Sequence, residues 1–219
     1  MSVAEYTDSS TPAVVTPSII AVLRAEDASA YGPVVRTLAD NGIGGIELTM
    51  STPGTLEQFE RVRAEAPEGA RIGLGTVTAA EQVWRADALE VDFIVTPTTD
   101  PDIIAAAVEA RIPIYPGGLT PTELWSGWNA GATAVKIFPA SLFGPDYLAH
   151  LRGPFPDIEV VPSGGVGLAE AQAWIRAGAK SVSVGGPLLG DALRGGDLGA
   201  LADRCAQFVD AVNKGRSAQ

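Results

Sequence analysis

The sequence contains little cysteine, histidine or lysine, and these shortages exclude some classes of protein. It has one cysteine, Cys205, and one histidine, His150, among 219 residues. A single cysteine cannot form an intramolecular disulfide, which excludes a small secreted scaffold held together by disulfides. No cluster of His, Cys and Asp has the spacing of metal ligands, which argues against a metal-dependent enzyme. His150 falls in a helical stretch far from any predicted strand end, and we expect Cys205 to pack in the core.

Basic charge and long apolar runs are also scarce. Fifteen Lys and Arg residues against 26 Asp and Glu residues give a formal net charge of −11, and such a field repels polyanions at long range. The apolar runs at 19–23 and 91–95 are too short to span a bilayer. The acidic start of the chain lacks the basic and apolar regions of a signal peptide. We therefore expect a cytoplasmic protein with no nucleic-acid partner and no membrane partner.

The composition favours one domain that spans residues 1–219. Hydrophobic residues make up 46% of the chain and charged residues 19%, and a chain of this length can bury an ordinary core. One unit, a short apolar run followed by a polar or glycine-rich break and a helical pattern, recurs along the chain. The unit occurs eight times, and its predicted strands cover residues 19–24, 45–50, 71–77, 93–97, 112–117, 134–139, 159–165 and 181–186.

Strands that alternate with helices predict an α/β fold with a parallel sheet, and eight such units in one domain predict a (β/α)8 TIM barrel. An open doubly wound sheet is the alternative. Its glycine fingerprint GxGxxG is absent after the first strand, where residues 24–27 read Arg-Ala-Glu-Asp. We expect residues 1–16 to form a short N-terminal extension and residues 198–212 to form the closing helix.

Four predicted strands carry a polar side chain near their C-terminal end, where barrel enzymes place their chemistry. Side chains at alternate positions share a face of a strand. The shared faces join Arg24 with Ile20 and Val22, Glu47 with Gly45 and Thr49, Thr76 with Ile72 and Leu74, and Lys136 with Ala134 and Phe138. We expect Arg24, Glu47, Thr76 and Lys136 to converge at one mouth of the barrel.

Lys136 is the most informative of these residues because it interrupts the apolar run Ala-Val-Lys-Ile-Phe. Burial disfavours the charged ammonium and lowers its pKa, and only the neutral amine can attack a carbonyl to form a Schiff base. Glu47 has the chemistry to move the protons that such a reaction requires. The alternative for both residues is a buried ion pair with a purely structural role.

The remaining candidates are groups that could hold anions. Arg24 could bind a substrate carboxylate through two hydrogen bonds, or it could form a salt bridge to the neighbouring Glu26 or Asp27. Thr76 offers a hydroxyl at a strand end, although a mere turn would also explain it. Two glycine-containing turns, at 163–165 and 185–186, follow the last two predicted strands, where barrels commonly bind phosphate. Tight turns alone would also explain these glycines.

Several short stretches carry a resemblance to a known family. They are Ala21–Arg24, Ile46–Thr49, Gly73–Val77, Ile94–Pro97, Tyr115–Gly117, Val135–Pro139, Gly153–Pro156 and Val161–Val166. In their order and spacing, the sequence resembles the 2-keto-3-deoxy-6-phosphogluconate (KDPG) and 2-keto-4-hydroxyglutarate (KHG) aldolase family. The resemblance implies a homotrimeric class I aldolase that needs no cofactor beyond a covalent imine on Lys136, with Glu47 as general acid and base.

The resemblance also implies the residues that bind the substrate. Arg24 and Thr76 match carboxylate-binding positions, Pro97 and Phe138 match pocket residues, and Gly164, Gly165, Gly185 and Gly186 match the phosphate site. Ser163 keeps a hydroxyl where KDPG-cleaving members have one. The sequence departs from the family at two points. Ser51 stands where some members carry an arginine, and Pro187 follows Gly185 and Gly186 in a loop where many members have a serine hydroxyl.

The resemblance implies reversible cleavage of KDPG to pyruvate and glyceraldehyde 3-phosphate, with the 2-keto-3-deoxy sugar acid and pyruvate as small-molecule partners. Segment 138–145 also looks like the 2-keto-3-deoxy-6-phosphogalactonate branch, so that epimer and 4-hydroxy-2-ketoglutarate are alternative substrates. A barrel that binds keto acids or sugar phosphates without turnover is the alternative from another class. Such a protein has no need of a buried lysine beside a carboxylate.

Overall fold

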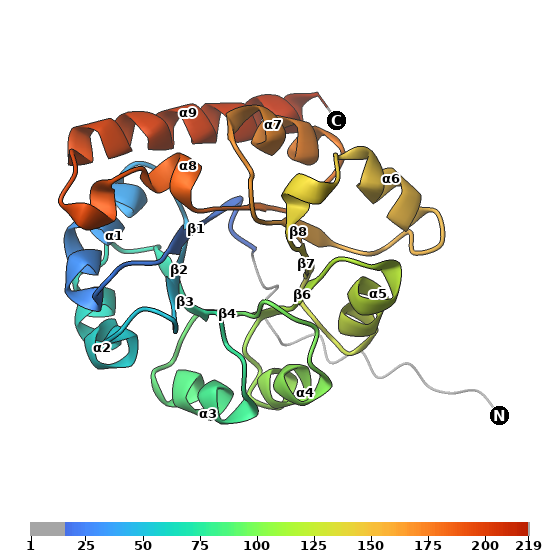
Figure 1. The fold of residues 1–219 in the computed structure, drawn as a ribbon, viewed down its shortest axis with the longest axis horizontal. Coiled ribbons are helices and arrows are strands. Elements are labelled where there is room, and N and C mark those ends of the chain that lie inside the picture. Colours follow the sequence, from blue (N-terminus) through green and yellow to red (C-terminus); the bar gives the residue numbers. More distant parts are fainter. Residues whose placement is uncertain (1–15, 219) are drawn as a thin grey trace.

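The structure, a computed structural model, describes residues 16–218 (Figure 1). Residues 1–15 of the expected N-terminal extension lie outside this range. The strands are β1 Ile19–Leu23, β2 Gly45–Thr49, β3 Arg71–Gly75, β4 Ile94–Val95, β5 Ile114–Tyr115, β6 Gly117–Gly118, β7 Val135–Ile137, β8 Val160–Pro162 and β9 Val182–Val184. The helices are α1 Tyr31–Asp40, α2 Thr55–Glu65, α3 Ala80–Ala88, α4 Pro101–Glu109, α5 Pro121–Asn129, α6 Asp146–Arg152, α7 Leu168–Arg176, α8 Gly186–Leu189 and α9 Leu198–Ser217. Three short 3-10 helices are η1 Ala28–Ala30, η2 Ala140–Leu142 and η3 Ala192–Arg194.

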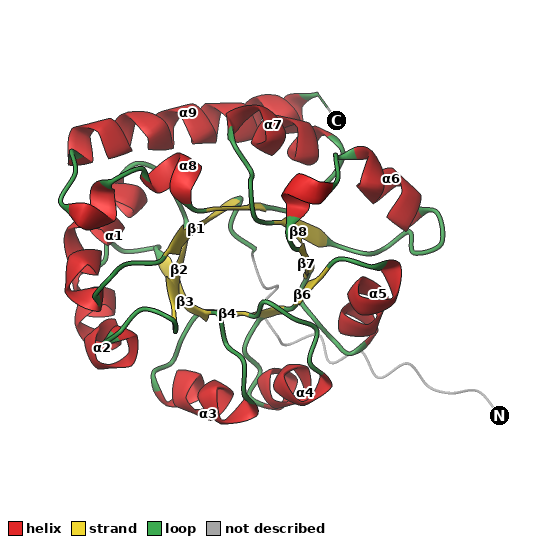
Figure 2. Cartoon of the chain, in the orientation of Figure 1, coloured by secondary structure: helices red, strands yellow, loops and turns green. Residues whose placement is uncertain are grey.

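The strands pair in parallel, which confirms the expected α/β class. One sheet has the strand order β5-β4-β3-β2-β1-β9 and the other β6-β7-β8. An isolated parallel bridge joins Ser163, which directly follows β8, to Ser183 of β9. Figure 2 shows the strands curving around a common centre with the helices outside them. The predicted strand 112–117 is two short strands, because Pro116 has no backbone N–H and separates β5 from β6.

The strand register fixes which side chains face the centre. Glu47 lies opposite Val22 of β1 and Gly73 of β3, and partners in a parallel pair share a face of the sheet. Glycines at 73 and 75 therefore occupy the inner face of β3. The expectation that Thr76 shares an inner face with Ile72 and Leu74 is wrong, because Ile72 and Leu74 pack in the larger core with the helices.

Two apolar clusters form the core. The larger cluster joins the outer faces of the strands to the helices. The smaller one takes its residues from the strands and the positions next to them: Ile20, Phe93, Val95, Tyr115, Ala134 and Val161. This second cluster lies among the strands, so the centre around which they curve is packed with side chains. The last helix, α9, begins at Leu198 as expected and continues to Ser217, and no helix of residues 16–218 is long and apolar enough to cross a membrane.

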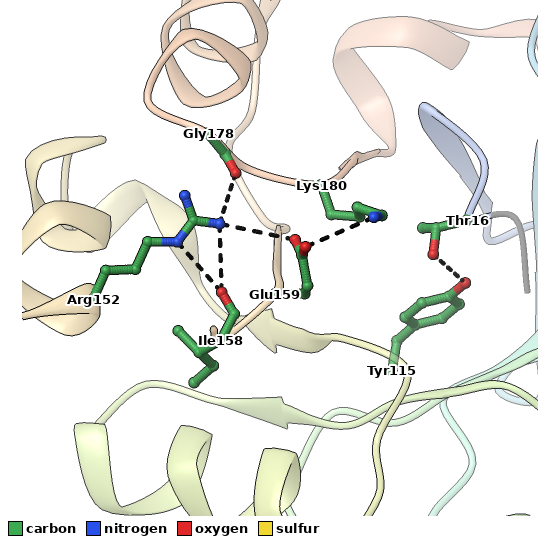
Figure 3. Close-up of polar contacts among 7 residues, drawn as sticks. All are labelled: Thr16, Tyr115, Arg152, Ile158, Glu159, Gly178 and Lys180. Carbon is green, nitrogen blue, oxygen red and sulfur yellow. Dashed lines mark hydrogen bonds and ion pairs between the residues drawn. The ribbon is translucent and has the colours of Figure 1, made fainter. Parts of the chain in front are cut away.

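Polar contacts join the two segments that lead into β8 and β9 (Figure 3). Arg152, the last residue of α6, donates to the carbonyls of Ile158 at 3.4 Å and Gly178 at 3.0 Å. Its guanidinium also lies 3.8 Å from Glu159, whose other oxygen lies 3.7 Å from Nζ of Lys180. Arg152 thereby holds the entrances of β8 and β9 together.

Candidate active site

The predicted site residues meet in one cavity of about 220 Å³. Most of them lie on strands or on the residues that directly follow strands, so the cavity sits at the C-terminal ends of the strands. Its lining contains every candidate from the sequence: Arg24, Glu47, Thr76, Pro97, Lys136, Phe138, Ser163, Gly164, Gly165, Gly185 and Gly186. The lining also includes Val22, Val166 and Pro187; of these, the sequence placed only Val22 on an inner face.

Lys136 is held in the centre of β7. It lies opposite Gly117 and Val161, and its backbone N–H donates to the carbonyl of Pro116 at 2.8 Å. The residue is only 7% exposed, and its Nζ lies 4.8 Å from the centroid of the Phe138 ring. Burial lowers the pKa of Lys136, and the positive charge of Arg24 lowers it further against the opposing effect of Glu47. The environment therefore favours the neutral, nucleophilic amine.

Glu47 is almost fully buried on β2, at 1% exposure. Burial raises the pKa of its carboxyl group, opposed by the positive charges of Lys136 and Arg24. Its Oε2 has no hydrogen-bond partner in the structure, which is uncommon for a buried carboxylate oxygen. The carboxyl group is thus free to hydrogen-bond a bound molecule and to exchange a proton with it.

Gly75 provides the space that the Glu47 side chain occupies. A Cβ at position 75 would overlap the Glu47 carboxylate. The absence of a side chain at Gly75 therefore leaves room for the Glu47 carboxyl group beside the backbone of β3.

Lys136 and Glu47 do not form a contact ion pair. The ion pairs between described residues are Arg36–Glu65, Arg152–Glu159, Lys180–Glu159 and Lys214–Asp210. The two buried groups line the same cavity and each changes the pKa of the other, yet they do not neutralise one another by direct contact. This arrangement disfavours the structural ion pair and leaves both groups facing the cavity.

Arg24 is held at the cavity mouth by two hydroxyl groups. Its guanidinium donates to Oγ of Ser51 and, at 3.2 Å, to Oγ1 of Thr76. It forms no ion pair with a described residue, so the expected alternative of a salt bridge to Glu26 or Asp27 is absent. Ser51 thus helps to orient the Arg24 guanidinium. Sequence reasoning assigned it no such role.

Thr76 reaches the cavity by leaving the strand geometry. Its φ of 58° lies in the left-handed region, where a β-branched residue is rare. Because of this turn, the Thr76 side chain does not follow the alternating pattern of β3, and its hydroxyl contacts Arg24. A backbone outlier of this kind is often found at a functional site.

Two glycine turns, at 164–165 and 185–186, also line the cavity. Gly164 and Gly165 both have positive φ, at 85° and 76°, a conformation that favours glycine. The adjacent Ser163 donates from Oγ to Oγ of Ser183 at 3.1 Å. Ser183 lies on β9, and sequence reasoning missed this contact because it depends on how β8 and β9 meet.

The rare residues excluded as candidates lie elsewhere. Cys205 is buried in α9, and burial raises the pKa of its thiol to about 11, so it is an unreactive core residue. His150 lies in the last turn of α6 and does not line the cavity. Within residues 16–218, no group of three or more His, Cys, Asp and Glu side chains is arranged to hold a metal ion.

Comparisons with known proteins match this chain to aldolases. The profile of a family described as KDPG and KHG aldolase matches residues 12–202. The chain is 33% identical over 200 residues to the 2-dehydro-3-deoxy-6-phosphogalactonate aldolase of Escherichia coli K12, which covers 90% of this chain and 95% of that protein. It is 32% identical over 158 residues to the 2-dehydro-3-deoxy-phosphogluconate aldolase of Haemophilus influenzae. This alignment covers 72% of this chain and 74% of that protein. A solved structure described as native KDPGal matches with a TM-score of 0.79 and 31% identity, over 90% of this chain and 95% of that one.

Proposed function

The chain belongs to the KDPG and KHG aldolase family, and from this premise we propose that it cleaves KDPG reversibly to pyruvate and glyceraldehyde 3-phosphate. The observation that carries the proposal is the relation between Lys136 and Glu47. They are buried in one cavity and affect each other's pKa, but they form no ion pair with each other. A structural role alone gives no reason to bury an amine and an acid in this way.

Lys136 supplies the nucleophile. Its neutral Nζ adds to the C2 ketone, and the resulting carbinolamine takes up a proton from solvent on its hydroxyl and loses water to give a protonated imine. The final hydrolysis to pyruvate and the neutral amine releases that proton again. The imine then accepts the electron pair of the C3–C4 bond as that bond breaks, and an enamine forms. The covalent imine takes the place of a cofactor, and the lowered pKa of Lys136 increases the fraction of amine that can begin the reaction.

Glu47 moves the protons. Its carboxylate removes the proton of the C4 hydroxyl, and C4 becomes the carbonyl carbon of the released aldehyde. The protonated acid then returns this proton to C3 of the enamine, which gives the imine of pyruvate. Water hydrolyses that imine to pyruvate and the free amine, so the water lost in the first step is regained. The raised pKa of Glu47 suits a group that both accepts and donates a proton.

The other cavity residues position the substrate. Arg24 and Thr76 bind the C1 carboxylate, and Pro97 and Phe138 form the apolar walls beside the imine. Ser163 lies beside the C4 hydroxyl. The phosphate group of the substrate lies against the backbone of the two glycine turns, at Gly164, Gly165, Gly185 and Gly186.

The galactonate epimer is the second candidate substrate. The relative named for phosphogalactonate aligns over 95% of its own length, whereas the relative named for phosphogluconate aligns over 74%. The hydroxyl of Ser163 supports the gluconate assignment. Because the two substrates differ only at C4, the same Lys136 and Glu47 serve both reactions, and 4-hydroxy-2-ketoglutarate is a further candidate.

The proposal includes the larger architecture. We infer that the two sheets and the Ser163–Ser183 bridge make up one closed barrel of eight strands, with β5 and β6 counted as one strand interrupted at Pro116. The single domain, the homotrimer and the cytoplasmic location stay predictions from the sequence.

A coupled assay for pyruvate release tests the function. The purified protein is given KDPG, its galactonate epimer, the unphosphorylated form of each, and 4-hydroxy-2-ketoglutarate. We expect pyruvate from at least KDPG and none from a Lys136→Met variant. A protein that is stabilised against heat by these acids but releases no pyruvate from any of them would be the non-catalytic binder instead.

A further inference from the structure

A second cavity opens beside the candidate active site. It has a volume of about 270 Å³ and shares four lining residues with the first cavity: Val22, Arg24, Gly185 and Gly186. Its other lining residues, Leu189, Gly190, Leu193 and Arg194, belong to the segment that follows β9. The two cavities therefore adjoin at these four residues, and Lys136 lines only the first of them.

The lining of the second cavity carries positive charge only. Among residues 16–218, the charged residues that line it are Arg24 and Arg194, and none of the acids in this range does so. This is unusual in a chain with 26 acidic and 15 basic residues. A pair of cations without a counterion favours an anionic occupant.

The two arginines differ in the hydrogen bonds that their guanidinium groups make. Arg24 already donates to Ser51 and Thr76. Arg194, at the end of η3, is exposed; its backbone N–H donates to the carbonyl of Asp191, but its guanidinium makes no hydrogen bond or ion pair with any residue in 16–218. Its guanidinium is therefore available to a ligand, and its planar fork suits the oxygens of a phosphate.

The turn between the cavities leaves room for such a ligand. No atom of the described part of the chain lies within 4 Å of a Cβ built on Gly186, so a phosphate can approach the backbone there without meeting one of these side chains. Pro187 follows, and it offers neither a backbone N–H nor a side-chain donor. The mouth thus lacks a hydroxyl at the turn and has a free guanidinium next to it.

We propose that Arg194 binds the phosphate of the substrate across the 185–186 turn and makes the enzyme selective for phosphorylated 2-keto-3-deoxy sugar acids. This inference rests on the proposed function. It places the phosphate at the 185–186 turn, which lines both cavities, so that Arg194 reaches it from the second cavity while Arg24 and Thr76 hold the carboxylate end. The resulting selectivity comes from a charged side chain outside the strands of the ring.

Kinetics of three variants test the assignment. The readout is the ratio of kcat/KM for a phosphorylated substrate to kcat/KM for its unphosphorylated form. Loss of a charge-assisted hydrogen bond to phosphate should lower this ratio by roughly 10- to 100-fold in Arg194→Gln. Arg194→Lys, which keeps the charge, should retain more of the ratio. Arg61→Gln removes an exposed arginine on α2 that lies outside both cavities, and it should leave the ratio unchanged.

Two results would overturn the proposal: a wild-type ratio close to one, or an Arg194→Gln variant whose ratio equals that of the wild type. A binding measurement separates these results from failure of the proposed function. Inorganic phosphate should raise the melting temperature of the wild type and of Arg61→Gln more than that of Arg194→Gln. If no substrate releases pyruvate, the aldolase function fails, and equal stabilisation of all three proteins by phosphate then refutes the role of Arg194 as well.

Discussion

At the scale of single residues, burial brings the pKa values of an amine and an acid closer together. It lowers the pKa of Lys136 and raises that of Glu47. Both shifts increase the population of the neutral forms, which is the opposite of what a stabilising ion pair requires. The cavity therefore keeps one group ready to attack a carbonyl and the other ready to exchange a proton.

Glu47→Gln should separate imine formation from turnover. Glutamine keeps the size of the side chain but cannot accept a proton, so we expect kcat for cleavage to fall by about 100-fold or more. Imine formation with pyruvate, measured by borohydride trapping, should fall much less. Equal loss of both activities would remove the proposed role of Glu47.

The pH dependence of kcat/KM gives a second test of the same pair. Glu47 must be deprotonated to accept a proton, and its pKa is raised, so activity should fall on acidification at a pH above the ordinary range of a glutamate. Lys136 must be neutral, and its lowered pKa allows activity at a pH where an exposed lysine is fully charged. The pH profile of kcat/KM of the wild type should fall on the acidic side, and Glu47→Gln should change this fall. If the acidic fall were identical in both proteins, it would have to come from the titration of another group.

Gly75→Ala should damage both the fold and the activity. The added methyl group overlaps the Glu47 carboxylate, so the acid or the strand must move, at a cost of about 1–3 kcal/mol in the free energy of unfolding. We expect kcat to fall by about tenfold or more. Gly144→Ala is the matched control because nothing lies within 4 Å of its Cβ. If Gly75→Ala behaved like this control in urea melts and in the pyruvate assay, the packing of Glu47 on β3 would be wrong.

The sequence predicted the cavity residues well because polar residues stood in apolar strands at regular positions. Arg24, Glu47 and Lys136 follow the period of two. Thr76 reaches the same cavity by a left-handed turn that no periodic pattern contains. The contact between Ser163 and Ser183 joins residues on different strands, and a single sequence does not fix how such strands meet.

At the scale of elements, the segments before β8 and β9 are held by one side chain. Arg152 donates to backbone carbonyls in both segments, so loops distant in sequence share a single guanidinium. The strand alternation predicted where β8 and β9 lie along the chain, but not this contact, because it depends on where the end of α6 lies in three dimensions.

Arg152→Gln should destabilise the fold without changing the chemistry. Loss of the partly buried hydrogen bonds to Ile158 and Gly178 should lower the free energy of unfolding by about 1–2 kcal/mol. The residue does not line the active-site cavity, so kcat should change little. Arg36→Gln, which removes the exposed pair with Glu65, should cost less than about 1 kcal/mol. Urea melts that show the same loss for both variants would contradict the role of Arg152.

At the scale of the whole molecule, the curved parallel sheets bring together residues that are far apart in the chain. Arg24 and Gly186 line the same cavity although they come from opposite ends of the sequence. The repeated strand and helix pattern predicted the parallel α/β arrangement, in which the strands place their C-terminal ends on one side. The pattern could not predict the second cavity, which depends on the path of the irregular segment after β9.

Borohydride trapping with pyruvate tests the central claim most directly. The chain has only three lysines, Lys136, Lys180 and Lys214, and Lys180 and Lys214 are exposed, so they serve as internal controls. Peptide mass analysis after reduction should find the adduct on Lys136 alone, with activity lost in proportion to labelling. An active enzyme in which Lys136 stays unmodified, or in which the adduct lies on Lys180 or Lys214, would contradict the account.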